Sequence, residues 1–264
     1  MGLLDGKKAL VFGVANDHSI AWGIAKALHE QGALVGFSSI AELAERRVKP
    51  LADSIGSTFV EPCNVQNDDE ITAVFEKWQA QHGKLDILIH SLAFAGREAL
   101  MGQFVNTTRD QFHLAMDISA YSLVAVTRAA LPLLNPGGSV MSMTYYASEK
   151  WVPNYNVMAI AKAALEASTR YLAVELGPKG IRVNCISAGP IRTLAASGVT
   201  GFKTMHNKFK EYAPLRRPIT IEDVGHTATW LCSDLASATT GEVIYVDGGI
   251  HHLALAAPEE PDVA

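Results

Sequence analysis

The chain has 264 residues, of which 48% are hydrophobic, and a formal net charge of −5. That size allows one large domain with a full core, and the mild negative charge argues against nucleic acid as a partner. The first residues hold an apolar run too short for a signal peptide, and charges interrupt the apolar runs elsewhere. We therefore expect a cytoplasmic protein with no membrane span, whose three scattered cysteines are reduced.

Strand-like and helix-like patterns alternate along the chain. Short apolar stretches that favour strands lie at 7–13, 33–39, 57–64, 84–92, 137–143, 180–187 and 241–249. Amphipathic helical patterns lie between them, at 19–32, 69–83, 109–133 and 155–176, the last ended by Gly177-Pro178. This alternation indicates a parallel sheet covered on both faces. The sequence predicts a single doubly wound, Rossmann-type α/β domain over 1–255 with about seven parallel strands, and a disordered acidic tail over 256–264.

The loop after the first predicted strand is a candidate phosphate site. It lacks the three glycines of the usual dinucleotide fingerprint, but Gly13 permits a sharp turn. Ser19 is placed to cap the next helix and to present a hydroxyl to a phosphate, while the helix N-terminus supplies free N–H groups. An ordinary strand–loop–helix junction with a serine cap explains the same residues, so this loop alone leaves both interpretations open.

The end of the second predicted strand bears on the choice of cofactor. It reads Phe37-Ser38-Ser39-Ile40, without the acid that often holds the ribose of NAD and without a basic residue for a 2′-phosphate. Arg46 and Arg47 come later, where we expect a solvated helix. NADH is therefore favoured over NADPH, with Ile40 at the discriminating position. Asn64 and Val65, after the third strand, are candidates to bracket the adenine.

Two tyrosines and a lysine form the candidate catalytic group. Tyr155 and Lys162 are seven residues apart, which on a helix returns them to nearly the same face, about 10.5 Å further along. Lys162 stands in an apolar stretch, where an ammonium needs a partner. A helix-start aromatic with a snorkelling lysine is the structural alternative. Tyr145 lies ten residues before Tyr155.

These residues, with the motifs "PNYNVMAIAKAALEA", "SAGPIRTLAASG" and "TIEDVG", resemble the short-chain dehydrogenase/reductases along essentially the whole chain. More narrowly, the chain is similar to a divergent branch, the bacterial enoyl-[acyl-carrier-protein] reductases of fatty-acid elongation. The resemblance implies NADH as cofactor, an enoyl thioester on an acyl carrier protein as substrate, and a homotetramer. It places the cofactor against Gly13, Ser19, Ile20, Ile40, Asn64, Val65, Leu92, Lys162, Ile191, Arg192, Thr193, Leu194 and Ala195.

The chain departs from typical members of the superfamily, which carry Tyr-x3-Lys with a serine thirteen residues before the tyrosine. Four residues before Lys162 stands Met158, and thirteen before that stands Tyr145. In the other register Ser142 precedes Tyr155 by thirteen, but the lysine position falls on Ala159. The stretch 116–119 also lacks the usual active-site asparagine. The Tyr145–Tyr155–Lys162 arrangement agrees with the divergent branch.

Geometry suggests a reason for this spacing. In a ketone the carbon that accepts hydride bears the oxygen itself. In an enoyl thioester hydride goes to the β-carbon, while negative charge collects on the carbonyl oxygen, two atoms further along. A tyrosine displaced from the lysine would follow that oxygen. Tyr155 would then donate a hydrogen bond to the enolate, with its phenolate made easier to form by Lys162, which binds the nicotinamide ribose. Tyr145 would shape the pocket or assist the proton path.

A substrate lid is expected near 192–212, where the segment 199–212 is amphipathic. The resemblance makes this a mobile lid; a surface helix packed on the core is the alternative. Its basic residues, with Arg216 and Arg217, are candidates to dock the acidic carrier protein. The resemblance puts the acyl chain against Ala95, Leu100, Tyr145, Tyr155, Met158, Phe202 and Met205.

Other functions compete with enoyl reduction. A carbonyl or alcohol oxidoreductase shares the fold, and a non-catalytic dinucleotide sensor is a third reading, against which Tyr155 and Lys162 argue. The nine histidines form no ligand set, and His90 follows a buried strand, as a core histidine does. We therefore predict no metal site.

Overall fold

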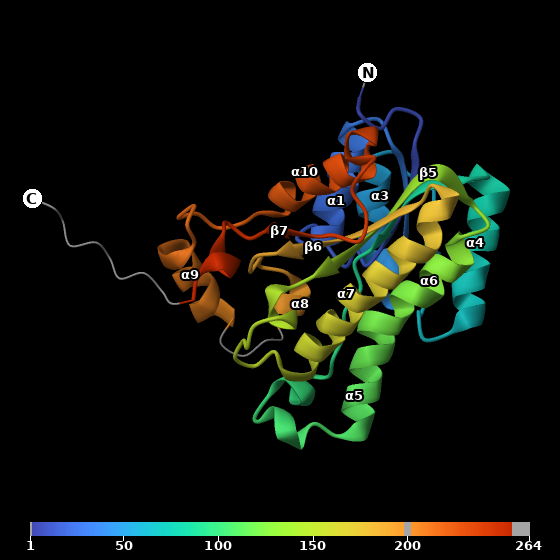
Figure 1. Ribbon diagram of the computed structural model, residues 1–264. Helices are drawn as coiled ribbons and strands as arrows, with labels where there is room; N and C mark the ends of the chain where they lie inside the picture. The colour runs from blue at the N-terminus through green and yellow to red at the C-terminus, as the bar shows by residue number, and fades with distance from the viewer. Residues whose placement is uncertain (1, 198–201, 255–264) are drawn as a thin grey trace, which may run out of the picture.

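One parallel sheet organises the protein. The computed structural model describes residues 2–197 and 202–254, and within them seven strands are ordered β3-β2-β1-β4-β5-β6-β7 (Figure 1). Every neighbouring pair is parallel, as the sequence predicts. The strands are β1 Lys8–Phe12, β2 Leu34–Ser39, β3 Val60–Pro62, β4 Leu85–His90, β5 Leu134–Thr144, β6 Arg182–Ala188 and β7 Val243–Val246.

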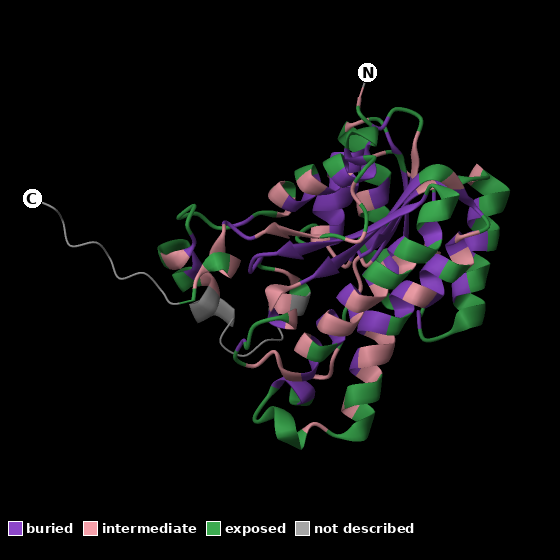
Figure 2. Cartoon of the chain, viewed as in Figure 1, coloured by how far each residue is buried: buried purple, intermediate pink, exposed green. Residues whose placement is uncertain are grey.

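Helices cover both faces of the sheet, and each face has its own apolar core (Figure 2). The helices are α1 Ile20–Glu30, α2 Ala41–Leu43, α3 Lys49–Ser54, α4 Asp68–His82, α5 Arg109–Met116, α6 Ser122–Ala130, α7 Asn156–Leu176, α8 Leu194–Ser197, α9 Phe202–Tyr212 and α10 Ile221–Cys232. One core joins the sheet to α1, α3 and α10, and the other joins it to α4, α6 and α7. Strand side chains alternate between the two, so Ala9 and Val11 enter the first core and Leu10 and Phe12 the second.

Local sequence sets the helix ends and crossings. Thr220 and Asp223 form a capping box that starts α10, and the side chain of Asn67 caps α4. Helices α1 and α10 cross closely at two glycines, because a Cβ on Gly225 would lie 2.6 Å from the carbonyl oxygen of Gly23. No larger residue fits that crossing without moving one of the helices.

The helix predicted over 109–133 differs from the structure. It is broken by a π-helical turn, Asp117–Tyr121, which separates α5 from α6. The hydroxyl of Ser119 in this turn accepts from the N–H of Phe94 at 2.9 Å and donates to the carbonyl of Phe94 at 3.2 Å. The extra residue of the π turn thus aims a side chain at the loop after β4.

No helix in the described part of the chain is long and apolar enough to cross a membrane.

Candidate active site

The carboxyl ends of four neighbouring strands bring the predicted cofactor residues to one edge of the sheet. Gly13 directly follows β1, Ile40 follows β2, and Asn64 and Leu92 come two residues after β3 and β4. From β1 the chain adds β2 and then β3 on one side of the sheet, and from β4 it adds β5, β6 and β7 on the other. The strand order therefore reverses between β1 and β4, which is the topological switch point of the sheet. Doubly wound sheets bind their ligands in the crevice at such a point.

Gly13 makes the sharp turn that the sequence predicts. Its φ is +103°, and a Cβ there would lie 2.1 Å from the carbonyl oxygen of Ser91. Glycine is therefore required both by the backbone conformation and by the approach of the two strand ends. The turn leaves a bare backbone surface in front of α1, whose first-turn amides carry partial positive charge.

Ser19 occupies the N-cap position of α1, but the prediction that its hydroxyl caps the helix is wrong. The Oγ atom instead accepts from the N–H groups of Ala15 and Asn16, each at 3.0 Å. The N–H groups of Ala15 and Asn16, inside the loop, would otherwise lack an acceptor, and the Ser19 hydroxyl supplies it. Ser19 is buried and shapes the loop from inside, while the half-buried Ile20 packs on the first core.

The residues predicted to hold adenosine differ in exposure. Ile40 is 47% exposed at the end of β2, whereas Ser38 and Ser39 are buried. Asn64 is exposed, and its Oδ1 accepts from the N–H of Gln66 at 3.1 Å, which holds the turn after β3. Val65 is buried. Arg46 and Arg47 are exposed in a π-helical turn, Ala44–Val48, as expected of a solvated helix.

The two tyrosines and the lysine converge at the carboxyl end of β5. Tyr145 follows this strand, and its ring centroid lies 5.0 Å from that of Tyr155, with the two planes at 64°. Tyr155 stands directly before α7, and Lys162 follows two turns later. The Lys162 Nζ donates to the carbonyl oxygen of Met143 at 2.7 Å and is buried. The structure thus brings together all three predicted catalytic residues.

The backbone on either side of Tyr155 is unusual. Asn154 and Asn156 have φ values of 59° and 39°, in the left-handed region that asparagine tolerates better than most residues. The Asn156 Nδ2 donates to the carbonyl oxygen of Gly102 at 3.3 Å. These two asparagines turn the chain sharply into α7, with Tyr155 between them.

Burial sets the protonation states of the three groups. It raises the pKa of Tyr155 above the ordinary range of a phenol, and it does the same for Tyr145. Burial alone accounts for the raised pKa of Tyr155, so the expectation that Lys162 eases formation of its phenolate stays a prediction. Burial lowers the pKa of Lys162 to about 8, and Cys185 and then Glu166 oppose that shift. Both phenols are protonated at neutral pH and able to donate.

An apolar cluster surrounds Tyr155. Leu100, Met158 and Ala161 are its buried members, and Ala95, Met116 and Tyr155 pack against them. The predicted acyl-chain residues Ala95, Leu100 and Met158 thus lie together. The sequence analysis missed Met116 and Ala161. Ala161 directly precedes Lys162, and the helical spacing from Met158 could have identified it.

The loop after β6 carries the remaining predicted cofactor residues. Ile191 is buried, Arg192 donates to the side chain of Asn207 at 3.3 Å, and the Thr193 hydroxyl accepts from the N–H of Ala196. Leu194 begins α8 and is half exposed. The side chains of Ala195, Phe202 and Met205 lie outside the described residues, as does the tail 256–264.

A cavity of about 220 Å³ lies between Tyr145 and helix α9. Its lining includes side chains that the sequence analysis missed: Tyr146, Pro190, Phe209, Tyr212 and Ile250. Phe209 and Tyr212 continue, at helical spacing, the apolar stripe on which the predicted Phe202 and Met205 stand. Extending that stripe along 199–212 would have found them.

His90 is a core histidine, as predicted. It is fully buried at the end of β4, with its two ring nitrogens 2.9 Å from the hydroxyl of Ser142 and 2.7 Å from that of Ser122. Burial lowers its pKa to about 3, so the ring is neutral. Within the described residues no group of three or more His, Cys, Asp or Glu side chains is arranged to hold a metal ion.

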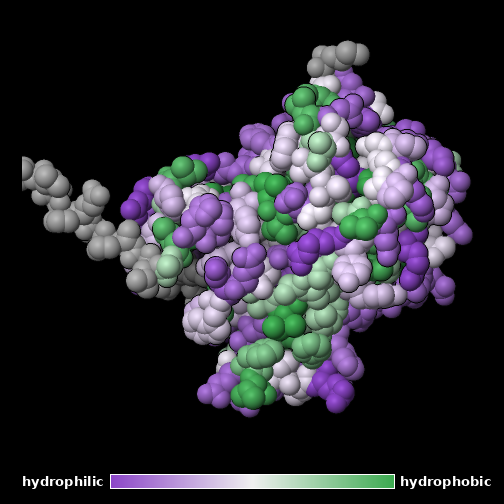
Figure 3. Space-filling model, viewed as in Figure 1, coloured by the Kyte–Doolittle hydropathy of each residue, from purple (hydrophilic) through white to green (hydrophobic). Residues whose placement is uncertain are grey.

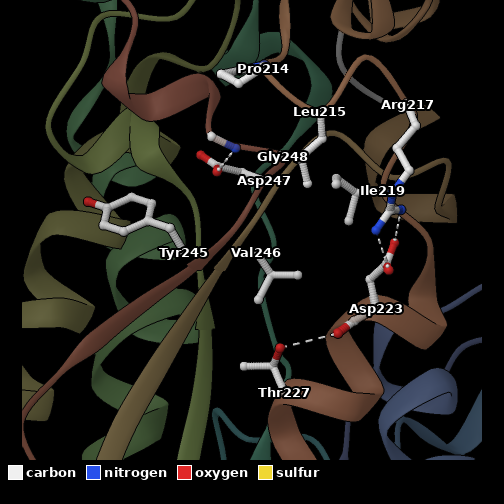
Figure 4. Close-up of a pocket in the computed structure, with 11 residues that line it drawn as sticks. Pro214, Leu215, Arg217, Ile219, Asp223, Thr227, Tyr245, Val246, Asp247 and Gly248 are labelled. Carbon is white, nitrogen blue, oxygen red and sulfur yellow. Dashed lines mark hydrogen bonds and ion pairs between the residues drawn. The ribbon is translucent and has the colours of Figure 1, made fainter.

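A larger cavity, of about 450 Å³, lies beside β7 and was not predicted (Figure 4). Arg217 and Asp223 form a two-pronged ion pair on its wall, at 2.7 and 2.8 Å, and Tyr245 and Leu215 contribute its apolar surface. Arg217 was predicted to help dock a carrier protein, but this pairing engages its guanidinium.

The fold and the site together define the class of protein. A doubly wound parallel sheet with a turn glycine at its switch point, and a tyrosine–lysine pair on the helix after β5, is the arrangement of a nicotinamide-dependent oxidoreductase of the short-chain dehydrogenase type.

The chain belongs to the enoyl-(acyl carrier protein) reductase family, whose profile matches residues 13–251. It is 49% identical to "Enoyl-[acyl-carrier-protein] reductase [NADH] 1" of Rhizobium meliloti, over 100% of this chain and 97% of that protein. It is 52% identical to the Bacillus cereus enzyme FabI, over 96% of this chain and all of that one.

Solved structures agree with this assignment. The B. cereus enoyl-acyl carrier protein reductase, solved with NADP⁺ and an indole naphthyridinone, has a TM-score of 0.94 and covers 97% of this chain and 100% of that one. The Anaplasma phagocytophilum reductase, solved with NAD, has a TM-score of 0.94 at 45% identity, covering 97% of this chain and 98% of that one.

Proposed function

We propose that this chain uses NADH to reduce the trans-2 double bond of enoyl thioesters carried by an acyl carrier protein, in type II fatty-acid elongation. The observation that carries the proposal is the place of Tyr155, in an apolar cluster with Leu100 and Met158 and two helical turns before Lys162. A protonated phenol there lies among apolar side chains of the kind that an acyl chain would contact, and it is the group that we assign to the thioester oxygen.

The residues at the sheet edge fit a dinucleotide. Gly13 packs its backbone against the carbonyl of Ser91, which lets the chain turn sharply from β1 toward the N-terminus of α1, where a pyrophosphate would bind. Lys162 has three N–H donors, and the described residues give one of them an acceptor, the carbonyl of Met143. The other donors are available to the nicotinamide ribose hydroxyls. Ile191, after β6, would lie by the nicotinamide amide, and Thr193 by the pyrophosphate.

When bound, NADH supplies the hydride that the β-carbon accepts. Tyr155 donates its O–H to the thioester carbonyl oxygen and stabilises the charge that gathers there, the kind of preorganised hydrogen bond that often dominates catalysis. The raised pKa of its phenol keeps it a donor rather than a base. Lys162 holds the cofactor and adds positive potential. Tyr145, packed against Tyr155 at 5.0 Å, fixes the orientation of that ring.

A carbonyl or alcohol oxidoreductase is the alternative that shares this fold. Typical members place their tyrosine four residues before the lysine, and here that position is Met158, a buried side chain with no proton to give. The test is a spectrophotometric assay with crotonoyl and longer enoyl thioesters against simple ketones, with NADH and NADPH used separately. Turnover of the thioesters supports the proposal, and turnover of ketones alone would refute it.

We also propose that α8 and α9 form a substrate lid over 192–212. The cavity between α9 and Tyr145 supports this role, because its lining joins the helix to the catalytic phenols. Lys208 and Lys210 are exposed on α9 and are the residues we assign to docking the acidic carrier protein. The homotetramer and the cytoplasmic location stay predictions.

A further inference from the structure

Glu166 is a buried glutamate of α7, about three helical turns after Tyr155. It is 5% exposed and follows Lys162 by four residues, so the two side chains lie on the same face of the helix. Its Oε1 accepts from the hydroxyl of Thr144 at 2.6 Å. Neither the proposed chemistry nor the motifs of the sequence assign this acid a role.

Consecutive residues at the end of β5 form hydrogen bonds with the side chains of Lys162 and Glu166 on α7. The carbonyl oxygen of Met143 accepts from Lys162 at 2.7 Å, and the next residue, Thr144, donates to Glu166. The residue after that, Tyr145, packs against Tyr155. The lysine, the acid and the catalytic phenol are therefore positioned by one short stretch of strand.

The electrostatic problem at Lys162 is the burial of an ammonium ion. It is 4% exposed, and a carbonyl dipole alone does not offset the loss of solvation of a full charge. The titratable groups that interact with it are His90 of β4, Cys185 of β6, and Glu166 of its own helix.

Two of those three groups are uncharged at neutral pH. Burial lowers the pKa of His90 to about 3 and raises that of Cys185 to about 12. Glu166 is the one carboxyl group among the three. Tyr245 of β7 faces Glu166 from the far side, and its phenol is also uncharged, with a pKa raised to about 12.

We propose that Glu166 is a positioning residue for the reaction: its carboxylate, fixed by Thr144, acts through its charge to keep Lys162 protonated, while the carbonyl of Met143 orients the ammonium. The inference rests on the proposed function, which assigns Lys162 to the cofactor ribose. Glu166 itself touches neither cofactor nor substrate. Its effect reaches the reaction through the charge of the lysine, so it is visible in a pH profile.

The test is NADH affinity, measured by fluorescence titration between about pH 6 and pH 9.5, in the parent and in Glu166→Gln. The amide keeps the size of the side chain and still accepts from Thr144. An ammonium is charged below its pKa, so removing the nearby anion makes Lys162 lose its charge at lower pH. We expect the basic limb of the binding profile, where affinity falls as the pH rises, to move down by about one pH unit from the Lys162 pKa of about 8. Affinity should then be about fivefold weaker near pH 8, about tenfold weaker above pH 9 and nearly unchanged near pH 6.

Three further variants make the outcome decisive. Glu175→Gln removes the same charge from an exposed position of the same helix and should leave the limb in place. Thr144→Val leaves the carboxylate but frees it, and should move the limb in the same direction by less. In a Lys162→Met background the limb should be absent, with or without Glu166→Gln.

A limb that stays where it is in Glu166→Gln, or an affinity lost equally at every pH, would overturn the proposal. So would a limb that still responds to Glu166→Gln when Lys162 is methionine. If Glu166→Gln does not fold, an unmoved limb in Thr144→Val decides against it. A parent protein that binds no NADH would instead remove the proposed function, so the two failures are distinguishable.

Discussion

The Tyr155 ring is half-buried against Leu100, Met158 and Ala161, and this apolar setting determines what its hydroxyl can do. Burial keeps the phenol protonated, so it acts as a hydrogen-bond donor. The place of Lys162 on a helix was readable from the sequence, but the left-handed corner that carries Tyr155 was not, because Tyr155 stands before α7 rather than on it. The direction of the Ser19 hydroxyl was not readable, because it depends on which amides in a loop lack an acceptor.

Tyr155→Phe should lower turnover of enoyl thioesters about 10²- to 10³-fold, since removal of one preorganised donor typically costs about 3–4 kcal/mol. NADH affinity should stay within about twofold, because the ribose contacts belong to Lys162. Lys162→Ala should lose cofactor binding first, and Tyr145→Phe should be the mildest of the three. Steady-state kinetics and NADH titration on all three variants give the answer. An active Tyr155→Phe beside an inactive Tyr145→Phe would mean that the two phenols have the opposite roles.

Ile40→Arg should move cofactor preference toward NADPH. Ile40 is half exposed at the end of β2, where a guanidinium would reach a 2′-phosphate. A hydrogen bond to a charged group is worth roughly 1.5–3 kcal/mol, so the ratio of kcat/KM values for the two cofactors should change by about tenfold or more. Ile40→Leu is the matched control. Equal efficiency with NADPH in the parent enzyme would contradict the assignment of NADH.

At the scale of elements, apolar runs and helical periodicity identified the seven strands of the described residues and the helices α1, α4 and α7, but they did not identify α10. The break between α5 and α6 escaped these patterns, because the π-helical turn Asp117–Tyr121 keeps a helical pattern of apolar residues while shifting its register. The β7 cavity escaped them as well, since its lining joins residues from 214 to 249 that only the tertiary fold brings together. Phe209 and Tyr212 on α9 were missed, although their helical spacing from Phe202 and Met205 can be seen in the sequence.

Reversing charge on the lid helix should separate carrier binding from chemistry. Lys208→Glu with Lys210→Glu should raise KM for carrier-bound enoyl substrate, because an acidic carrier loses two exposed cations. Turnover of the small crotonoyl thioester should change little. Lys179→Glu, after α7 and at the opposite edge of the sheet, is the control. Equal loss on both substrates would indicate damage to the lid cavity rather than to docking.

Gly225→Ala should destabilise the fold by about 1–3 kcal/mol, the usual cost of overpacking a tight contact. The added Cβ would lie 2.6 Å from the carbonyl oxygen of Gly23 and push α10 away from α1. Urea unfolding gives the change in midpoint. Gly96→Ala is the control, because a Cβ there meets nothing within 4 Å. Equal midpoints for the two variants would show that the crossing tolerates a wider separation.

At the scale of the whole molecule, the sheet is enclosed by two cores, yet apolar surface remains outside. Figure 3 shows apolar side chains gathered on the lower part of the visible face. Around the segment between β4 and α5, Phe94, Met101 and Val105 are 52%, 49% and 83% exposed. On α7, Ile160, Tyr171 and Val174 are 40%, 75% and 78% exposed, and helical spacing puts them on one face. A single subunit leaves that face of α7 uncovered.

Introducing charge on this face should dissociate the predicted homotetramer. Tyr171→Asp with Val174→Asp would place two carboxylates in an apolar interface, where unpaired charges are strongly unfavourable. Light scattering should give a tetramer for the parent and smaller species for the double variant. Leu34→Asp, at the amino end of β2, is the control. A parent that is monomeric at working concentration would contradict the prediction.

Asn154 and Asn156, on either side of Tyr155, fix the point at which α7 begins. With φ values of 59° and 39°, they prevent the helix from growing toward its N-terminus, whatever helix-forming residues precede it. Tyr155 is therefore held just outside the helix, while Met158 fills the helical position four residues before Lys162. The left-handed corner sets where the phenol stands relative to the ammonium, so a substitution at either asparagine would shift the Tyr155 hydroxyl without touching the tyrosine itself.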